Sequence, residues 1–459
     1  MNRLQQIACV LIIATALVAG FARSKAEKMA LINAAAQGRT DQVKVLLEKG
    51  MNINELDKYS RSALLLAAEA GHTDTVKFLI EKGADINMKD SAGNNALLIA
   101  TLKGQVDTVE LLLEKGIDIN SKNNNGETAL LNAINQDNID ITSLLIEKGA
   151  DLNIRDKDGD IALTIAIRVN NTDIATMLLE KGVDPNSKDR SGSPALISSI
   201  EQGDLTLTQR LLEKGVDVNT KDKEGNTALI LAVRMDDLDI VSLLLEKGAN
   251  PNMKSKEGET ALSLAVSADN LDLSKLMLEK GADPNVKDSE GSSPLTIALA
   301  NENVDIVKLL LDKGADANIK NAEGEFPLIQ ALSSENSDAI KLLLDKGADA
   351  NAKDSTGYPA LMMVVNAENT EIVKLLLDKG ANPNTKDSDG YTPLMQAISN
   401  GNEEATKLLI SKGADVNAKN SDGESILTIA KNSCGVDDES EETLNENPII
   451  KMLKKAGAK

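Results

Sequence analysis

Few side chains in this sequence have the types and spacing that catalysis or metal binding requires. His72 is the only histidine, and Cys9 and Cys434 are the only cysteines. A nucleophile–histidine pair or a His/Cys metal site needs several such residues together, and the chain does not supply them. His72 follows a glycine between two expected helices. We therefore expect no catalytic residues, no metal site and no cofactor.

The run Asp156-Lys157-Asp158-Gly159-Asp160 looks like the start of a calcium-binding loop. Such a loop needs glycine at its sixth position and glutamate at its twelfth, where this chain has Ile161 and Ile167. There is also no glycine-rich phosphate loop, and no pair of carboxylates stands out as an acid–base pair. Because residues 156–160 fall in register with turns elsewhere in the chain, we interpret them as an ordinary turn.

The elements that position all these side chains recur every 33 residues. A glycine closes the second expected helix of each recurrence without a slip in register. Such self-similarity indicates a stack of structural repeats that bury their apolar faces against one another. These glycines are Gly50, Gly83, Gly116, Gly149, Gly182, Gly215, Gly248, Gly281, Gly314, Gly347, Gly380 and Gly413.

One unit, residues 222–254, shows the pattern most clearly. A turn at 222–225 is followed by Asn226 and Thr227, whose side-chain oxygens can cap a helix over 228–235, and Asp236-Asp237 can end that helix and cap a second one. Gly248 then suits the left-handed position that ends that helix. The apolar stripes are Ala228, Leu229, Ala232 and Val233 in the first helix and Ile240, Val241, Leu244 and Leu245 in the second.

This unit resembles the ankyrin repeat. Residues 387–394 read D-S-D-G-Y-T-P-L, residues 342–351 read L-L-L-D-K-G-A-D-A-N, and twelve asparagines from Asn54 to Asn417 mark the position after the closing glycine. The family's usual histidine after the leucine is absent, with Leu65, Ile197 and Met395 in its place. This difference changes the hydrogen bonding expected at the start of the first helix. The resemblance implies an all-α repeat solenoid, in which helix-turn-helix units stack and carry short β-turn or hairpin fingers.

The resemblance covers residues 27–459, and composition sets the other boundaries. Acidic residues concentrate after Ser433, where the last unit is longer than the others. We expect a signal peptide at 1–26 and a solenoid at 27–459, consisting of an N-terminal capping repeat at 27–56, regular repeats at 57–419 and a C-terminal capping repeat at 420–459 with an acidic insertion at 434–447.

The N-terminal stretch has the composition of a secretory signal. Arg3 precedes an apolar run at 7–21, and Ser24-Lys25-Ala26 fits a small-x-small cleavage site. We expect an exported protein, periplasmic in a bacterium or secreted; the alternative is a membrane anchor through residues 7–21. Cys9 lies before most of the apolar run, which argues against a lipoprotein.

Charge limits the class of partner. The net charge is −21, and removing residues 1–26 removes three basic residues and no acidic ones, leaving −24. Such a surface repels nucleic acid and anionic lipid, so we expect neither as a partner, and no membrane insertion after cleavage. Cys434 alone remains, so no intramolecular disulfide can form. An exported protein without disulfides fits a bacterial envelope better than a disulfide-rich extracellular module. We also expect the protein to be a monomer.

Ankyrin resemblance implies a non-catalytic module that holds a partner protein on its concave surface of fingers and first helices. The alternatives are a mechanical spacer without a specific partner and an enzyme or metal-binding protein; a spacer would have uniform turn tips, which this chain lacks. Acidic turn residues recur at Glu224, Glu257, Glu290 and Glu323, and three of the six aromatic residues fall on consecutive repeats. We predict a partner with an apolar centre and a basic rim, bound at Phe326, Tyr358, Tyr391, Glu290, Glu323 and Glu325.

Overall fold

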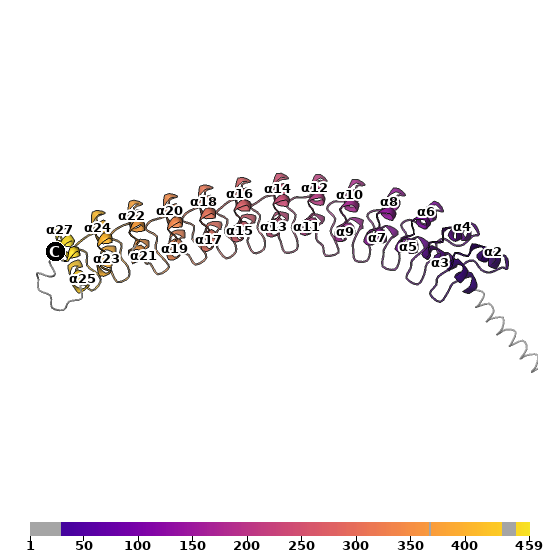
Figure 1. Cartoon of the computed structure of the whole chain (residues 1–459), viewed down its shortest axis with the longest axis horizontal. Coiled ribbons are helices and arrows are strands. Elements are labelled where there is room, and N and C mark those ends of the chain that lie inside the picture. Colours follow the sequence, from indigo (N-terminus) through magenta and orange to yellow (C-terminus); the bar gives the residue numbers. More distant parts are fainter. Residues whose placement is uncertain (1–28, 367–368, 434–446) are drawn as a thin grey trace, which may run out of the picture. The chain divides into compact units, whose positions relative to one another are not determined.

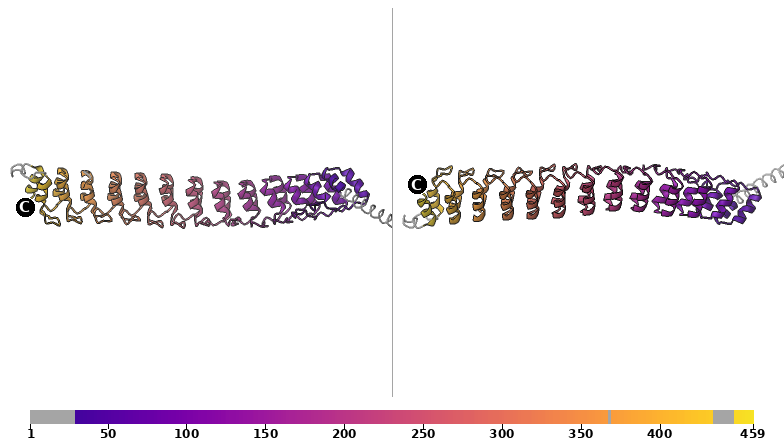
Figure 2. Two further views of the ribbon diagram at one scale, coloured as in Figure 1. Left: turned by 90° about the horizontal axis from the view of Figure 1, so that it is seen from below. Right: turned by 90° about the horizontal axis from the view of Figure 1, so that it is seen from above.

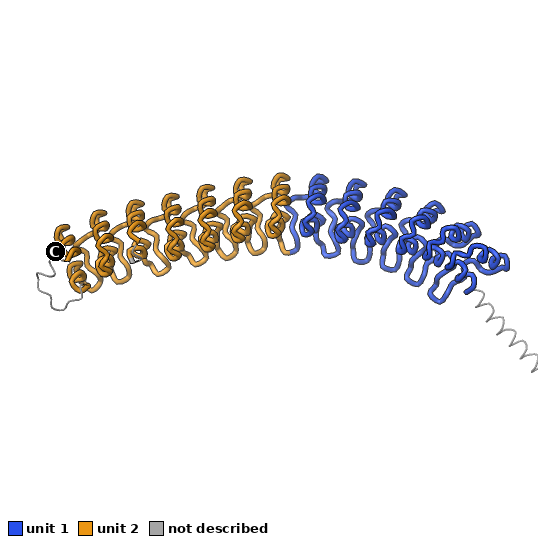
Figure 3. The backbone as a smooth tube through the Cα atoms, in the orientation of Figure 1, with its two compact units in different colours: residues 1–223 blue, residues 224–459 orange. Residues whose placement is uncertain are grey.

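The computed structural model describes residues 29–366, 369–433 and 447–459. It divides the chain into two compact units, residues 1–223 and residues 224–459 (Figure 3). The predicted signal peptide and nearly all of the acidic insertion lie outside the described residues. Asn447, at the end of that insertion, caps the last helix by accepting hydrogen bonds from the N–H groups of Ile449 and Ile450.

Unit 1 consists of helix pairs whose first and second members form two rows (Figure 1). Residues 29–36 are helical and open the first row. The row continues with α3 (Ala63–Glu69), α5 (Ala96–Leu102), α7 (Ala129–Asn135), α9 (Ala162–Arg168) and α11 (Ala195–Glu201). The second row is α2 (Thr40–Glu48), α4 (Thr73–Glu81), α6 (Val106–Glu114), α8 (Ile139–Glu147), α10 (Thr172–Glu180) and α12 (Leu205–Glu213).

Unit 2 repeats the same arrangement. Its first row is α13 (Ala228–Arg234), α15 (Ala261–Ser267), α17 (Pro294–Ala300), α19 (Pro327–Ser333), α21 (Ala360–Asn366), α23 (Pro393–Ser399) and α25 (Ile426–Ser433). Its second row is α14 (Leu238–Glu246), α16 (Leu271–Glu279), α18 (Val304–Asp312), α20 (Ser337–Asp345), α22 (Thr370–Asp378), α24 (Glu403–Ser411) and α27 (Pro448–Lys455). Within each unit the connecting loops run along one edge of the helices (Figure 2).

Most local signals act as the sequence predicts, but of the two residues expected to cap α13 only Thr227 does so, and Asn226 does not. Thr227 accepts a hydrogen bond from the N–H of Ile230 and caps α13, and Asp237 does the same for α14 through Ile240. Gly248 ends α14 at a φ of +90°, where a Cβ would be strained. All eight stripe residues of this unit are buried. The predicted all-helical repeat stack is therefore confirmed in the part of the chain that the structure describes.

Asparagines hold successive repeats together. Asn285 Oδ1 accepts the N–H of Asp316 in the next repeat at 2.8 Å, while its Nδ2 donates to the Gly314 carbonyl at 3.2 Å. Asn318 and Asn351 make the same pair of bonds one and two repeats further on. Because each amide satisfies one donor and one acceptor of its neighbour, the loops stack in a fixed register.

The fingers contain little regular strand structure. In the described part of the chain, isolated antiparallel bridges join Leu56 with Ser62, Lys188 with Pro194, Lys353 with Pro359 and Lys419 with Ser425. The fingers are thus turns with at most one bridging pair each. No helix among these residues has the length and apolar character that a membrane crossing requires.

Candidate functional site

His72 packs into the repeat stack. It precedes α4, and a Cβ placed on Gly38 of the preceding repeat would lie 2.6 Å from its Nδ1 atom. The histidine ring therefore fills the space that glycine leaves open, and its role is structural. No group of three or more His, Cys, Asp and Glu side chains within residues 29–366, 369–433 and 447–459 is arranged to hold a metal ion.

Tyr358 and Tyr391 occupy equivalent places in adjacent repeats of unit 2. The N–H of each donates to the carboxylate of the aspartate that opens its turn, Asp354 or Asp387, at 2.8 Å. Both side chains are half-buried. The Tyr358 hydroxyl donates to Gln396 Oε1 on α23 at 3.0 Å, so this ring is held against the next repeat.

The turn around Asp354 is electrostatically stabilised. Burial by itself raises the pKa of the Asp354 carboxyl, but hydrogen bonds from the Thr356 hydroxyl and from the N–H groups of Tyr358 and Thr356 outweigh it. The pKa of Asp354 therefore lies below its ordinary value of 3.8. The charged carboxylate is the form that fixes the backbone of Tyr358.

Phe326 immediately precedes α19 and is half-buried, with Lys320 Nζ 4.4 Å from the centre of its ring. Glu290 and Glu323 are exposed at turns, and Glu325 is half-buried, where it accepts a hydrogen bond from Asn321. The structure thus places all six predicted site residues in unit 2, on turns or at the junction of a turn and a first helix. A shared binding role for them stays a prediction.

The first helices of unit 2 present a row of side chains that the fold only half buries. We call this row the first-helix face; it is Leu231, Leu264, Ile297, Gln330, Met363 and Gln396. Gln330 donates from Nε2 to the Thr296 carbonyl at 3.1 Å, yet its buried Oε1 has no donor among the described residues. Since a buried acceptor without a donor costs stability, Oε1 is a candidate contact for a partner.

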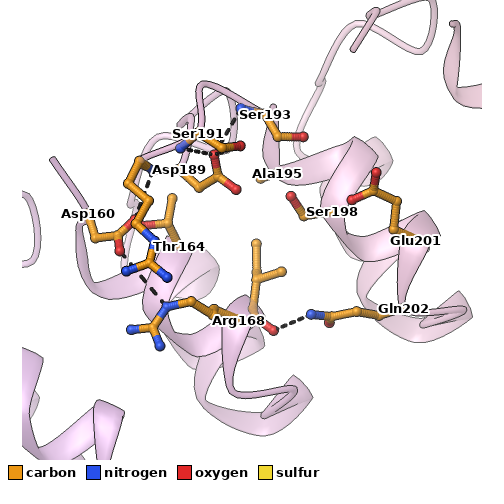
Figure 4. A pocket seen from close by; sticks show the side chains of 12 residues that line it. Asp160, Thr164, Arg168, Asp189, Ser191, Ser193, Ala195, Ser198, Glu201 and Gln202 are labelled. Atoms are coloured by element: carbon orange, nitrogen blue, oxygen red, sulfur yellow. Dashed lines mark hydrogen bonds and ion pairs between the residues drawn. The ribbon is translucent and has the colours of Figure 1, made fainter. Parts of the chain in front are cut away.

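Unit 1 carries a polar site that our sequence reasoning missed. Asp160, only 2% exposed, accepts the N–H of Arg190 at 3.0 Å and the Thr164 hydroxyl at 3.2 Å, and its carboxylate lies 3.9 Å from Arg168 Nε. These residues line a hollow of about 260 Å³. Figure 4 shows Asp160 and Arg168 on one side of it and Glu201 on the other.

A second hollow of about 180 Å³ shares Asp160, Arg168 and Arg190 with the first and is also lined by Asn132. Asn132 is 4% exposed, and its Nδ2 has no acceptor in the part of the chain that is described. The sequence held a signal for this site, because Ile99 and Ile165 stand at the same position one repeat before and after. The amide of Asn132 is thus a change from its two neighbours, although the same position carries glutamine further along, at Gln330 and Gln396.

Comparison with protein families is consistent with this architecture. A family model described as ankyrin repeats, three copies, matches six stretches of the chain, which overlap within two groups. Only residues 1–7, 190–195 and 421–459 lie outside every match. No curated protein matches the chain. The matched stretches are residues 8–90, 31–123, 97–189, 196–288, 283–354 and 328–420.

Proposed function

Because the chain belongs to the ankyrin-repeat family, we propose that it is a non-catalytic scaffold that binds a protein partner on its fingers and first helices. Ankyrin repeats generally act as protein–protein interaction modules, and members of the family are typically non-catalytic. We place the binding segment in unit 2, around Phe326, Tyr358 and Tyr391. The exported chain acts as a monomer in this proposal.

The observation that carries the proposal is an unpaired side-chain oxygen on the first-helix face. Gln330 Oε1 is buried without a donor, and Gln330 lies one helical turn after Phe326, whose carbonyl accepts its N–H at 3.1 Å. When the half-buried Gln330 side chain turns outward, a backbone N–H or a basic side chain of a partner would satisfy this oxygen. The unpaired oxygen and an aromatic side chain therefore lie one helical turn apart at the start of α19.

Tyr358 supports the proposal through its rigidity. Its hydroxyl bond to Gln396 holds a large, half-exposed ring in one orientation before any partner arrives. A side chain that is already ordered loses less conformational entropy on binding, and tyrosine is a frequent anchor at interfaces. Tyr391 repeats the placement one layer further along.

The negative charge around Phe326 indicates what kind of partner this surface would bind. Glu290 and Glu323 are exposed, and Glu325 lies next to Phe326 in the chain. Carboxylates around an apolar centre attract basic groups and repel acidic ones, which affects association rate and partner choice more than affinity. The proposed partner of unit 2 therefore has an apolar centre and a basic rim.

The test is capture of partners from the native envelope fraction, followed by affinity measurements with the purified partner. Replacing Tyr358 and Tyr391 by alanine should weaken binding by roughly 2–4 kcal/mol if both rings are anchors. Tyr358→Phe keeps the ring and loses only the hydroxyl, so it should retain most of the affinity.

Tyr59 provides the matched control. It is a tyrosine at a finger of unit 1, with half of its surface exposed. Tyr59→Ala should leave affinity unchanged. An equal loss for Tyr59→Ala would move the site to unit 1, and unchanged affinity for the double tyrosine variant would refute the proposed segment.

A further inference from the structure

Asn132 differs from the equivalent residues of the two neighbouring repeats. It occupies the fourth position of α7, where Ile99 and Ile165 fill the equivalent positions of α5 and α9. Both isoleucines are buried, and so is Asn132, which is 4% exposed. Its Nδ2 has no acceptor among the described residues. A buried amide in place of an aliphatic side chain costs stability, so its presence calls for a role other than packing.

The surroundings of Asn132 are two adjoining hollows built from three consecutive repeats. One of about 180 Å³ is lined by Asn132 and the other of about 260 Å³ by α11. Arg168 on α9 and Arg190 on the following finger line both. Either volume has room for a carboxyl-bearing side chain. The hollows therefore present two guanidinium groups to anything that enters.

The carboxylates of this region are already occupied within the protein. Asp160 accepts the Arg190 N–H and the Thr164 hydroxyl. Asp189 accepts the N–H groups of Ser191 and Ser193 at 2.8 and 2.9 Å. Acceptors used in this way hold the turns in place, and they have little capacity left for a ligand.

The arginines, by contrast, have donors to spare. Arg168 donates from one terminal nitrogen to Asn135 Oδ1 at 3.1 Å, and its Nε lies 3.9 Å from Asp160. Arg190 has its terminal nitrogen 4.0 Å from Asp158, beyond hydrogen-bond distance. A guanidinium carries five N–H donors in a planar fork that matches a carboxylate. The side chains of Arg168 and Arg190 are 40% and 55% exposed, so a ligand can reach them.

We propose that these hollows receive a carboxylate from an acidic segment of a protein partner, with Arg168 and Arg190 as the binding groups and Asn132 as an added donor. The proposal rests on the proposed function, because it takes the occupant to be a protein. A carboxylate carries one negative charge. A phosphate carries nearly two, and the Asp156 and Asp158 carboxylates that line the same hollow repel it more strongly.

The experiment measures fluorescence anisotropy with three labelled peptides of one backbone, carrying glutamate, glutamine or phosphoserine at the same positions. The glutamate peptide should bind the full chain, and the glutamine peptide should bind at least about tenfold more weakly, since it lacks the charge. Arg190→Gln should weaken binding of the glutamate peptide by a similar factor. Because Arg190 makes only a long ion pair, this variant should keep its fold.

Two further variants separate binding from folding. Arg168→Lys keeps the charge beside buried Asp160 but loses the planar fork, so affinity should fall while the fold is retained. Asn132→Ile restores the side chain of the neighbouring repeats, so it should raise the Tm and weaken binding of the glutamate peptide. Arg210→Gln, at an arginine paired with Glu213 on α12, is the matched control and should change binding less than about twofold.

Three results would overturn the proposal: equal affinity for the glutamate and glutamine peptides, unchanged affinity in both Arg190→Gln and Asn132→Ile, or binding of the phosphoserine peptide alone. The proposed function is tested separately by the tyrosine variants of unit 2. Loss of partner affinity in those variants, together with no binding of the glutamate peptide, would refute the carboxylate site and leave the proposed function standing.

Discussion

Replacing Glu302 or Glu335 by glycine should stabilise unit 2. Both glutamates lie in the tight connection between the two helices of a repeat, at φ of +58° and +54°. Gly401 occupies the same place in a later repeat at +68°. The left-handed region costs a residue with a Cβ about 1–2 kcal/mol, and the greater freedom of glycine in the unfolded chain takes back about 0.5–1 kcal/mol. The net gain is about 0.5–1 kcal/mol for each site.

Asp269 tests whether backbone strain is the cause. It lies at the same position with φ of +54°, but its carboxylate accepts hydrogen bonds from Asn301 and Asn303 at 3.0 and 3.4 Å. For Glu302 and Glu335, no side-chain hydrogen bond is found within the described residues. Asp269→Gly loses its bonds, worth about 0.5–1.5 kcal/mol, so relief of strain and loss of bonding should nearly cancel.

The assay is equilibrium urea denaturation, combined with native-state hydrogen exchange of α17 to α20. Hydrogen exchange measures the free energy of local opening even where a long repeat array unfolds in several steps. Glu302→Gly and Glu335→Gly should slow exchange in these helices, and the double variant should gain about 1–2 kcal/mol if the sites act independently. No gain in either single variant, or an equal gain in Asp269→Gly, would refute the strain argument.

Three further predictions concern the chain ends and pH. The exported protein should begin at Glu27, which N-terminal sequencing of the native protein checks; retention of residues 3–22 in a membrane pellet would indicate an anchor instead. Deleting residues 436–446 with a short Gly-Ser closure should change the Tm little, because the free energy of closing a loop depends weakly on its length; a loss of several kcal/mol would contradict this. Because the pKa of Asp354 is lower in the folded protein than its ordinary 3.8, its contribution to stability is complete above that value and is lost as the pH falls through the folded pKa. Asp354→Asn should therefore reduce the free energy of unfolding near neutral pH and flatten its decline in acid, and an unchanged acid limb would contradict that origin.

The sequence by itself determined the repeat and the local geometry of each unit. Thr227, Asp237 and Gly248 were correctly assigned as two caps and a helix end, because such signals act through hydrogen bonds to backbone groups a few residues away. The 33-residue period then specified the stack, since every unit must bury the same apolar stripe against the next. The equivalence of Tyr358 and Tyr391 also followed from the period alone.

Only the tertiary structure decided which side chains of different repeats meet and which polar groups they leave unpaired. The hydrogen bond from Tyr358 to Gln396 joins residues about one repeat apart. Likewise, Arg168 and Arg190 line the same hollow as Asn132, although they lie about one and two repeats further along the chain. Periodicity places such residues on neighbouring layers, but side-chain length, rotamer and competition among many nearby donors and acceptors decide the pairing. The sequence shows that Asn132 stands where the two neighbouring repeats have isoleucine; the packed structure shows that its buried donor has no acceptor within the described chain.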